Sequence, residues 1–205
     1  ADERGSAGRW IGRATLAGRR ATIDSRLVDL QPQRLDGRAA AMRLGGPLVL
    51  QLDELPLQGG GSWQALQLGF EGRLEGMLDG RPQTVQLAFE GRGSAAAVEL
   101  RRLDARAGAA QAQAALQLTL DGNRRWQLRS RGELAQFDPL PWFPGPETSP
   151  WRRGPHRLNG SWSLDLTLPD RALRLPPLQW LQTLHGDADL RLADSTLAGL
   201  PLRAT

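Results

Sequence analysis

Hydrophobic and polar positions alternate with a period of two over most of the chain. The clearest case is the segment 112–134, in which Leu116, Leu118 and Leu120 are separated by polar residues and followed by Asp121-Gly122. A period of two places successive side chains on opposite faces of a strand, and Asp-Gly is typical of a hairpin turn. The segment therefore predicts a long β-hairpin with one apolar and one polar face.

Comparable alternation predicts strands along much of the remaining sequence. We expect them over residues 10–16, 21–30, 39–44, 48–52, 63–78, 85–89, 158–168 and 186–202. Gly45-Gly46-Pro47 is expected to interrupt pairing, because proline has no backbone N–H to donate. One short helix is expected at 178–184, where leucines recur at helical spacing after a pair of prolines.

Two motifs recur within the chain. Phe70-Glu-Gly-Arg73 returns as Phe89-Glu-Gly-Arg92, which we expect on the facing arms of one hairpin. Leu-Asp-Gly begins at residues 35, 78 and 120, with spacings of 43 and 42 residues. Such a period indicates a stack of similar units.

We divide the chain into a repeated β-hairpin segment at 1–136, a Pro- and Trp-rich loop or cap at 137–157, and a continuing segment at 158–205, together forming one structural unit.

The charge pattern argues against nucleic acid as a partner. The chain has 26 basic residues, all of them Arg, and 22 acidic ones, which gives a formal net charge of +4. The two signs are interspersed along the predicted strands, as in Glu71-Gly-Arg73-Leu-Glu75. We interpret this pattern as a solvated face of mixed sign and not as a track for phosphates.

No group of residues indicates catalysis or metal binding. The chain has no Cys, which removes disulfides, thiolate nucleophiles and Cys-based metal sites. His156 and His185 lack partners at metal-site or triad spacing, so we interpret them as surface or hydrogen-bonded histidines. Asp187 and Asp189 alone offer too few oxygen ligands for a cation. We therefore predict no enzymatic activity, no metal and no cofactor.

The apolar stripes leave two alternatives for the fold. They would form either the core of a closed β-sandwich, serving as an adhesion or carbohydrate-binding module, or the uncovered face of a curved sheet. Only 5% of residues are aromatic and 24 are Gly, and the alternating runs are long. These features favour an all-β fold: a long, curved antiparallel sheet with an open hydrophobic groove. The predicted lining residues are Leu66, Leu68, Phe70, Val85, Leu87, Phe89, Leu116, Leu118, Leu120, Trp126, Leu128, Trp162, Leu164, Leu166, Leu190 and Leu192.

Short stretches of the chain resemble the TamB family, the inner-membrane subunits of the translocation and assembly module, and their AsmA-like relatives. The resemblance lies in Asp-Ser-Thr-Leu-Ala-Gly-Leu-Pro-Leu at 194–202 with the run at 178–190 before it, and also in 28–35 and 136–142. It implies a periplasmic, trough-shaped β structure that bridges the inner and outer membranes.

Family membership would imply transport of phospholipid, aid to outer-membrane protein assembly beside a TamA-like barrel partner, or both. It would also make this chain an internal piece of a longer protein that carries an inner-membrane anchor. No catalytic residues are carried over from the family.

Overall fold

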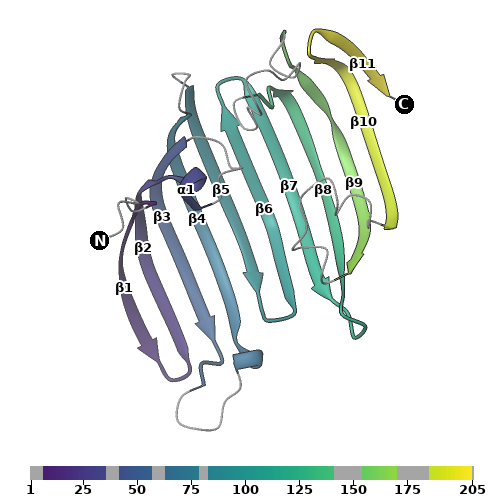
Figure 1. Ribbon diagram of the computed structural model, residues 1–205. Helices are drawn as coiled ribbons and strands as arrows, with labels where there is room; N and C mark the ends of the chain where they lie inside the picture. The colour runs from purple at the N-terminus through teal and green to yellow at the C-terminus, as the bar shows by residue number, and fades with distance from the viewer. Residues whose placement is uncertain are drawn as a thin grey trace.

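A single antiparallel sheet organises the chain. The computed structural model describes residues 7–35, 42–56, 63–78, 83–140, 154–169 and 185–204. Within them, eleven strands pair in chain order, each with the next (Figure 1). The strands are β1 (Arg9–Ala17), β2 (Arg20–Leu30), β3 (Met42–Asp53), β4 (Gln67–Leu78), β5 (Gln83–Gly93), β6 (Ala97–Ala107), β7 (Ala110–Leu120), β8 (Arg125–Phe137), β9 (Leu158–Pro169), β10 (His185–Leu197) and β11 (Leu200–Ala204). A one-turn helix, α1 (Pro32–Leu35), and a 3₁₀ turn, η1 (Trp63–Ala65), complete the described elements.

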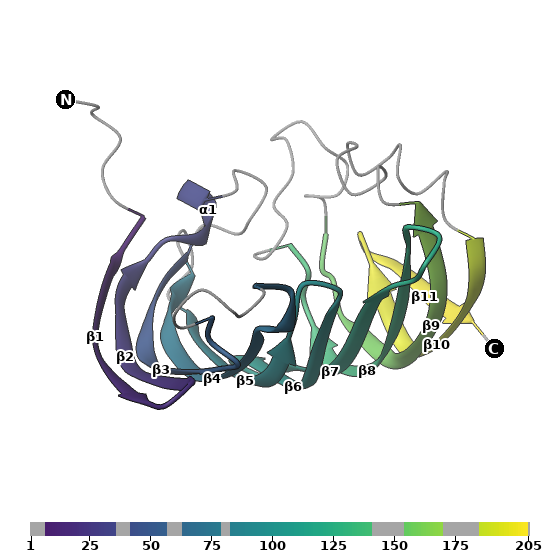
Figure 2. The same ribbon diagram turned by 90° about the horizontal axis from the view of Figure 1, so that it is seen from below.

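The sheet is one curved layer that does not close on itself. Its two edges are β1 and β11, and Figure 2 shows the strands as an arc with α1 on the concave side. Among the described residues no second sheet covers either face. The predicted all-β fold with an open, curved antiparallel sheet is therefore confirmed. The closed-sandwich alternative lacks its second sheet in this part of the chain.

Irregular strand pairing contributes to the curvature. The register shifts within β2, β6, β8 and β10. These four strands run in the same direction, because every second strand of an antiparallel meander does so. In three of these strands a residue other than glycine adopts a positive φ: Asp29 (55°), Gln136 (49°) and Asp194 (44°). Such bulges bend a strand and increase its twist.

Most of the buried hydrophobic side chains among the described residues gather at one end of the strands. The cluster consists of Met42, Leu44, Leu74, Leu78, Val85 and Ala107, with Leu27, Leu30, Leu87 and Phe89 packed against it. Val85 has no exposed surface. Full burial of an aliphatic side chain contributes about 1.5–3 kcal/mol, so this cluster is the main apolar anchor of the described sheet.

The structure corrects two expectations about strand boundaries. Gly45-Gly46-Pro47 does not break the chain into two strands, because β3 runs through it and keeps one register with β4 on either side. Gly46 has φ 154°, and a Cβ there would overlap the carbonyl of Arg73, so glycine allows the two backbones to approach. Leu66 was expected within a strand, but it lies between η1 and β4, and its N–H donates to the Trp63 carbonyl at 3.3 Å.

The Leu-Asp-Gly recurrence does not mark equivalent places in the fold. Leu35 ends α1, whereas Leu78 ends β4 and Leu120 ends β7, and these two strand ends lie at opposite ends of the sheet. The recurring unit of the described structure is the strand pair. The expected helix at 178–184 and most of the expected cap at 137–157 lie outside the described residues.

Candidate functional site: the concave apolar trough

Cross-strand pairing aligns the apolar positions into continuous rows. Directly paired residues point to the same face of a sheet, so each row can be followed from one strand to the next. The first row is Leu16, Ala21, Leu52, Leu68, Gly93, Val98, Leu118, Leu128, Leu166 and Gly186. The second is Ala14, Ile23, Leu50, Phe70, Gly91, Leu100, Leu116, Ser130, Leu164 and Ala188. The third is Gly12, Ser25, Leu48, Gly72, Phe89, Leu103, Ala114, Gly132, Trp162 and Leu190. Together these three rows define what we call the trough floor.

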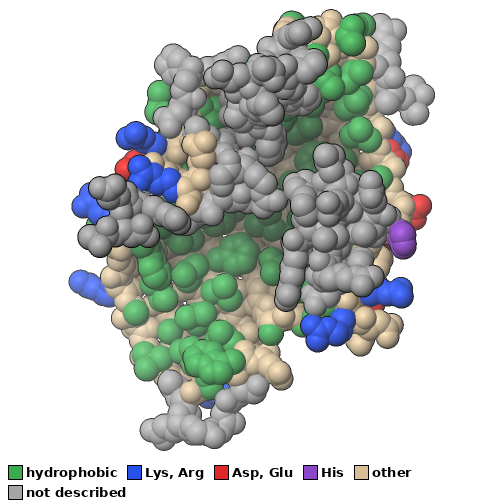
Figure 3. All heavy atoms as spheres, viewed as in Figure 1, with side chains coloured by type: hydrophobic (Ala, Val, Ile, Leu, Met, Phe, Trp, Pro, Cys, Tyr) green, Lys and Arg blue, Asp and Glu red, His purple; other side chains and the backbone are tan. Residues whose placement is uncertain are grey.

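The apolar face is the concave one. Figure 3 looks onto the side of the sheet that carries α1, and apolar side chains spread over much of its described surface, with most charged side chains at the margins. Leu16 is 60% exposed, Leu190 54% and Val98 38%. Monomeric soluble proteins rarely expose a large contiguous apolar surface unless it binds something.

The structure places fifteen of the sixteen predicted lining residues in strands, with their side chains on this face. Leu66 is the exception, because it lies between η1 and β4. Ten of the fifteen are in the trough floor. Leu87 and Leu192 belong to the adjoining row and Val85 to the buried cluster, while Leu120 and Trp126 pair with each other beyond the first row. Whether these residues bind a ligand stays a prediction.

Sequence reasoning missed the contribution of β6. Val98 and Leu100 are followed by Leu103 and Ala105, so the alternation slips by one residue at Arg101-Arg102. The structure has a register shift at this point, and both arginines are exposed and pair with acids: Arg101 with Glu90 at 3.3 Å, and Arg102 with Asp104. A slip in period at a pair of charged residues was the signal for a bulged strand.

The polar side-chain atoms of the trough floor form hydrogen bonds within the sheet. Ser25 Oγ donates to the Leu48 carbonyl at 2.6 Å, and Ser130 Oγ donates to the Ala115 carbonyl at 3.2 Å. Trp162 Nε1 donates to Ser130 Oγ at 3.0 Å. The surface that the three rows present to a ligand therefore consists of apolar side-chain atoms. A peptide or sugar would lose its hydrogen bonds to water there with little replacement, which costs free energy.

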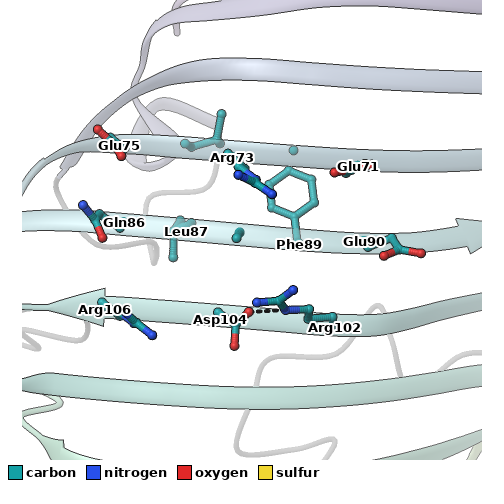
Figure 4. Close-up of a pocket in the computed structure, with 13 residues that line it drawn as sticks. Glu71, Arg73, Glu75, Gln86, Leu87, Phe89, Glu90, Arg102, Asp104 and Arg106 are labelled. Carbon is teal, nitrogen blue, oxygen red and sulfur yellow. Dashed lines mark hydrogen bonds and ion pairs between the residues drawn. The ribbon is translucent and has the colours of Figure 1, made fainter.

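The opposite face carries the charges. Cross-strand ion pairs such as Arg92–Glu99 at 2.5 Å and Arg129–Asp165 at 3.1 Å lie on it. A hollow of about 320 Å³ lies mainly on this face near Ala88, between β4 and β6, and is lined largely by charged side chains (Figure 4). Exposed pairs of this kind contribute only about 0–1 kcal/mol each, so their main effect is to keep this face in water.

The histidine and carboxylate positions offer no second site in the described part of the chain. His156 is buried, and its Nδ1 accepts a hydrogen bond from the Ala198 N–H at 3.1 Å. This agrees with the interpretation of His156 as a hydrogen-bonded histidine. Asp189 pairs with Arg191 at 3.2 Å. Among the described residues, no three His, Asp or Glu side chains are grouped so that they would hold a metal ion.

Comparisons with known proteins leave the trough as the principal clue to function. None of the described helices has the length and apolar character required to span a bilayer. No protein-family model, no curated protein and no solved structure matches this chain.

Proposed function

We propose that the trough carries the acyl chains of phospholipids, as a segment of a periplasmic bridge between the inner and outer membranes. The observation that supports the proposal most is the continuity of the trough floor. Its three rows cross ten strands. Apart from the indole N–H of Trp162, the only polar side chains in these rows are those of Ser25 and Ser130. The trough floor is therefore apolar from β1 to β10.

The energetics of acyl-chain transfer fit such a surface. Moving hydrocarbon out of water is favourable by about 0.8 kcal/mol per CH₂, so an unshielded chain cannot readily cross an aqueous gap. A floor made of repeated Leu, Val, Ala and Gly positions gives a chain similar surroundings at each step. It can then move along the floor without a deep trap, while the charged face remains in water.

The TamB resemblance supports the location and partners in this proposal. The segment would belong to a longer, inner-membrane-anchored protein of the periplasm, with a TamA-like outer-membrane barrel as partner. Assistance to outer-membrane protein assembly is the second role that the resemblance implies, and it would operate beside lipid transport or in place of it. No enzymatic step is proposed.

A charge placed on the trough floor tests lipid carriage. Leu118 lies in the first row, between Val98 and Leu128, and its neighbour Gln117 points to the charged face. Leu118→Arg is expected to abolish co-purification of phospholipid, because a guanidinium on the floor would have to lose water to admit an acyl chain. Gln117→Arg is the matched control and should keep its lipid. Equal lipid content in the two variants, with β-type circular dichroism in both, would contradict the proposal.

A further inference from the structure

Three aromatic side chains of the trough floor are each paired with a glycine on the neighbouring strand. Phe70 is opposite Gly91 and Phe89 is opposite Gly72, both between β4 and β5. Trp162 of β9 is opposite Gly132 of β8. These pairs bring the bulkiest side chains of the three rows next to the only residue type that has no side chain.

The rings extend sideways over the glycines. A Cβ built on Gly72 would lie 2.9 Å from Cε2 and 3.0 Å from Cε1 of Phe89, and one built on Gly91 would lie 2.5 Å from Cζ of Phe70. A Cβ on Gly132 would overlap the Cζ2 and Cη2 atoms of the Trp162 indole. Each ring therefore occupies the space that a side chain on the facing strand would have filled. Figure 4 shows the Phe89 ring reaching from β5 toward β4.

The indole of Trp162 is held in this position by a hydrogen bond. Its Nε1 donates to Ser130 Oγ, which in turn donates to the Ala115 carbonyl. The chain of two bonds satisfies the polar atom of the indole inside the sheet, so the ring presents only carbon to the trough. A tilted indole would lose this bond, which contributes about 0.5–1.5 kcal/mol.

We propose that the glycines facing these rings set the free depth of the trough, and so its selectivity for the thickness of the hydrocarbon it carries. This inference rests on the proposed lipid-carrying function. A ring that extends over a glycine leaves the space above the floor to the ligand, whereas a ring that is pushed upright fills that space. Unbranched acyl chains need the least depth, and methyl-branched chains need more, so branched chains depend most on the glycines.

Gly72 is the position where this proposal is tested most cleanly. The three atoms nearest to a Cβ at Gly72 all belong to the Phe89 ring, whose torsions can yield. At Gly91 and Gly132 a Cβ would also meet a backbone carbonyl, of Glu99 and Gln113 respectively. Gly72→Ala therefore raises a ring with the least disturbance of strand pairing, and Gly72→Ala combined with Phe89→Leu removes the ring that would be raised.

The experiment measures binding of two lysophosphatidylglycerol probes, one with a palmitoyl and one with a methyl-branched phytanoyl chain. Gly72→Ala is expected to weaken binding of the phytanoyl probe by about tenfold relative to the palmitoyl probe, the loss expected when roughly two methyl groups no longer fit. The double variant is expected to restore the wild-type ratio. An unchanged ratio in Gly72→Ala, or the same altered ratio in the double variant, would overturn the proposal.

Different results would count against lipid carriage and against the role of the glycines. If the unmodified protein binds neither probe, lipid carriage itself is wrong; if it binds both and the ratio does not respond to Gly72→Ala, only the role of the glycines is wrong. Should Gly72→Ala lose its β-sheet circular dichroism, Phe89→Ala replaces it. Loss of the ring deepens the floor there, so this variant must shift the preference toward the phytanoyl probe, and an unchanged ratio would contradict the proposal.

Discussion

Phe70 and Phe89 lie diagonally across β4 and β5, with their ring centroids 6.4 Å apart and their planes tilted by 49°. The relationship follows from the repeated sequence Phe-Glu-Gly-Arg. When two copies of this motif pair in antiparallel register, the Phe of each copy faces the Gly of the other. The motif is therefore self-complementary, and it fixes the register of the hairpin as well as the positions of its rings.

The aromatic pair should be energetically coupled. Phe70→Leu and Phe89→Leu each keep an apolar side chain but remove the ring contact. Tilted aromatic pairs are worth about 0.5–1.5 kcal/mol beyond burial, so the double variant is expected to be less destabilised than the sum of the single variants by that amount. Urea denaturation of the four proteins measures the coupling. Strict additivity would mean that the rings stabilise the sheet independently.

The free energy of unfolding should depend on position within the apolar face. Leu78 is 2% exposed and belongs to the buried cluster, whereas Leu190 is 54% exposed on the trough floor. Leu78→Ala is expected to cost about 2–5 kcal/mol, and Leu190→Ala at most about 0.5 kcal/mol. Chemical denaturation of both variants compares them directly. Similar losses would show that Leu190 is packed as firmly as the cluster.

Asn159 should be important for the bulged ends of β8 and β10. Its side-chain Oδ1 accepts from the Gln136 N–H at 2.8 Å, and its Nδ2 donates to the Asp194 carbonyl at 3.0 Å. Both partners have positive φ, so the amide joins two strained backbones. Asn159→Ala is expected to cost about 1–3 kcal/mol of unfolding free energy, because it leaves these groups without their partner.

A matched control for this prediction is available in the β7–β8 turn. Asn123 is an exposed turn residue, and Asn123→Ala should change the unfolding free energy by no more than about 0.5 kcal/mol. Thermal denaturation of both variants provides the comparison. If Asn159→Ala proves as mild as Asn123→Ala, the bulges do not depend on the amide.

The ion pairs of the charged face should be nearly neutral for stability and for lipid binding. Arg129 and Asp165 pair at 3.1 Å, with side chains 62% and 56% exposed. Asp165→Asn is expected to change the unfolding free energy by less than about 1 kcal/mol and to leave lipid co-purification unchanged. A loss of lipid in this variant would place the binding surface on the wrong face of the sheet.

The sequence pattern predicted which face a side chain occupies better than it predicted partners and boundaries. Alternation at Leu116, Leu118 and Leu120 is enough to place them on one face, because the period of a strand is two. The break expected at Gly45-Gly46-Pro47 was wrong, because the absence of a Cβ at Gly46 lets β3 and β4 approach and continue. That effect depends on the neighbouring strand and is not visible in a single segment.

Other features of the site lie between residues that are distant in the sequence. The hydrogen bond from Trp162 to Ser130 spans 32 residues, and nothing local to either position indicates it. The pairing of Phe70 with Gly91, in contrast, follows from the repeated motif once an antiparallel hairpin is assumed. Repeats that face each other therefore carry register information that simple alternation does not.

Photo-crosslinking in cells shows directly whether acyl chains lie in the trough. A photoreactive amino acid is placed in turn at Leu118 and Leu166, which share the first row, and at Gln117 on the charged face; crosslinked adducts are identified by mass spectrometry. Phospholipid adducts are expected at both leucine positions, and none are expected at Gln117. Lipid adducts at all three positions, or only polypeptide adducts at the two leucines, would contradict a trough that carries acyl chains.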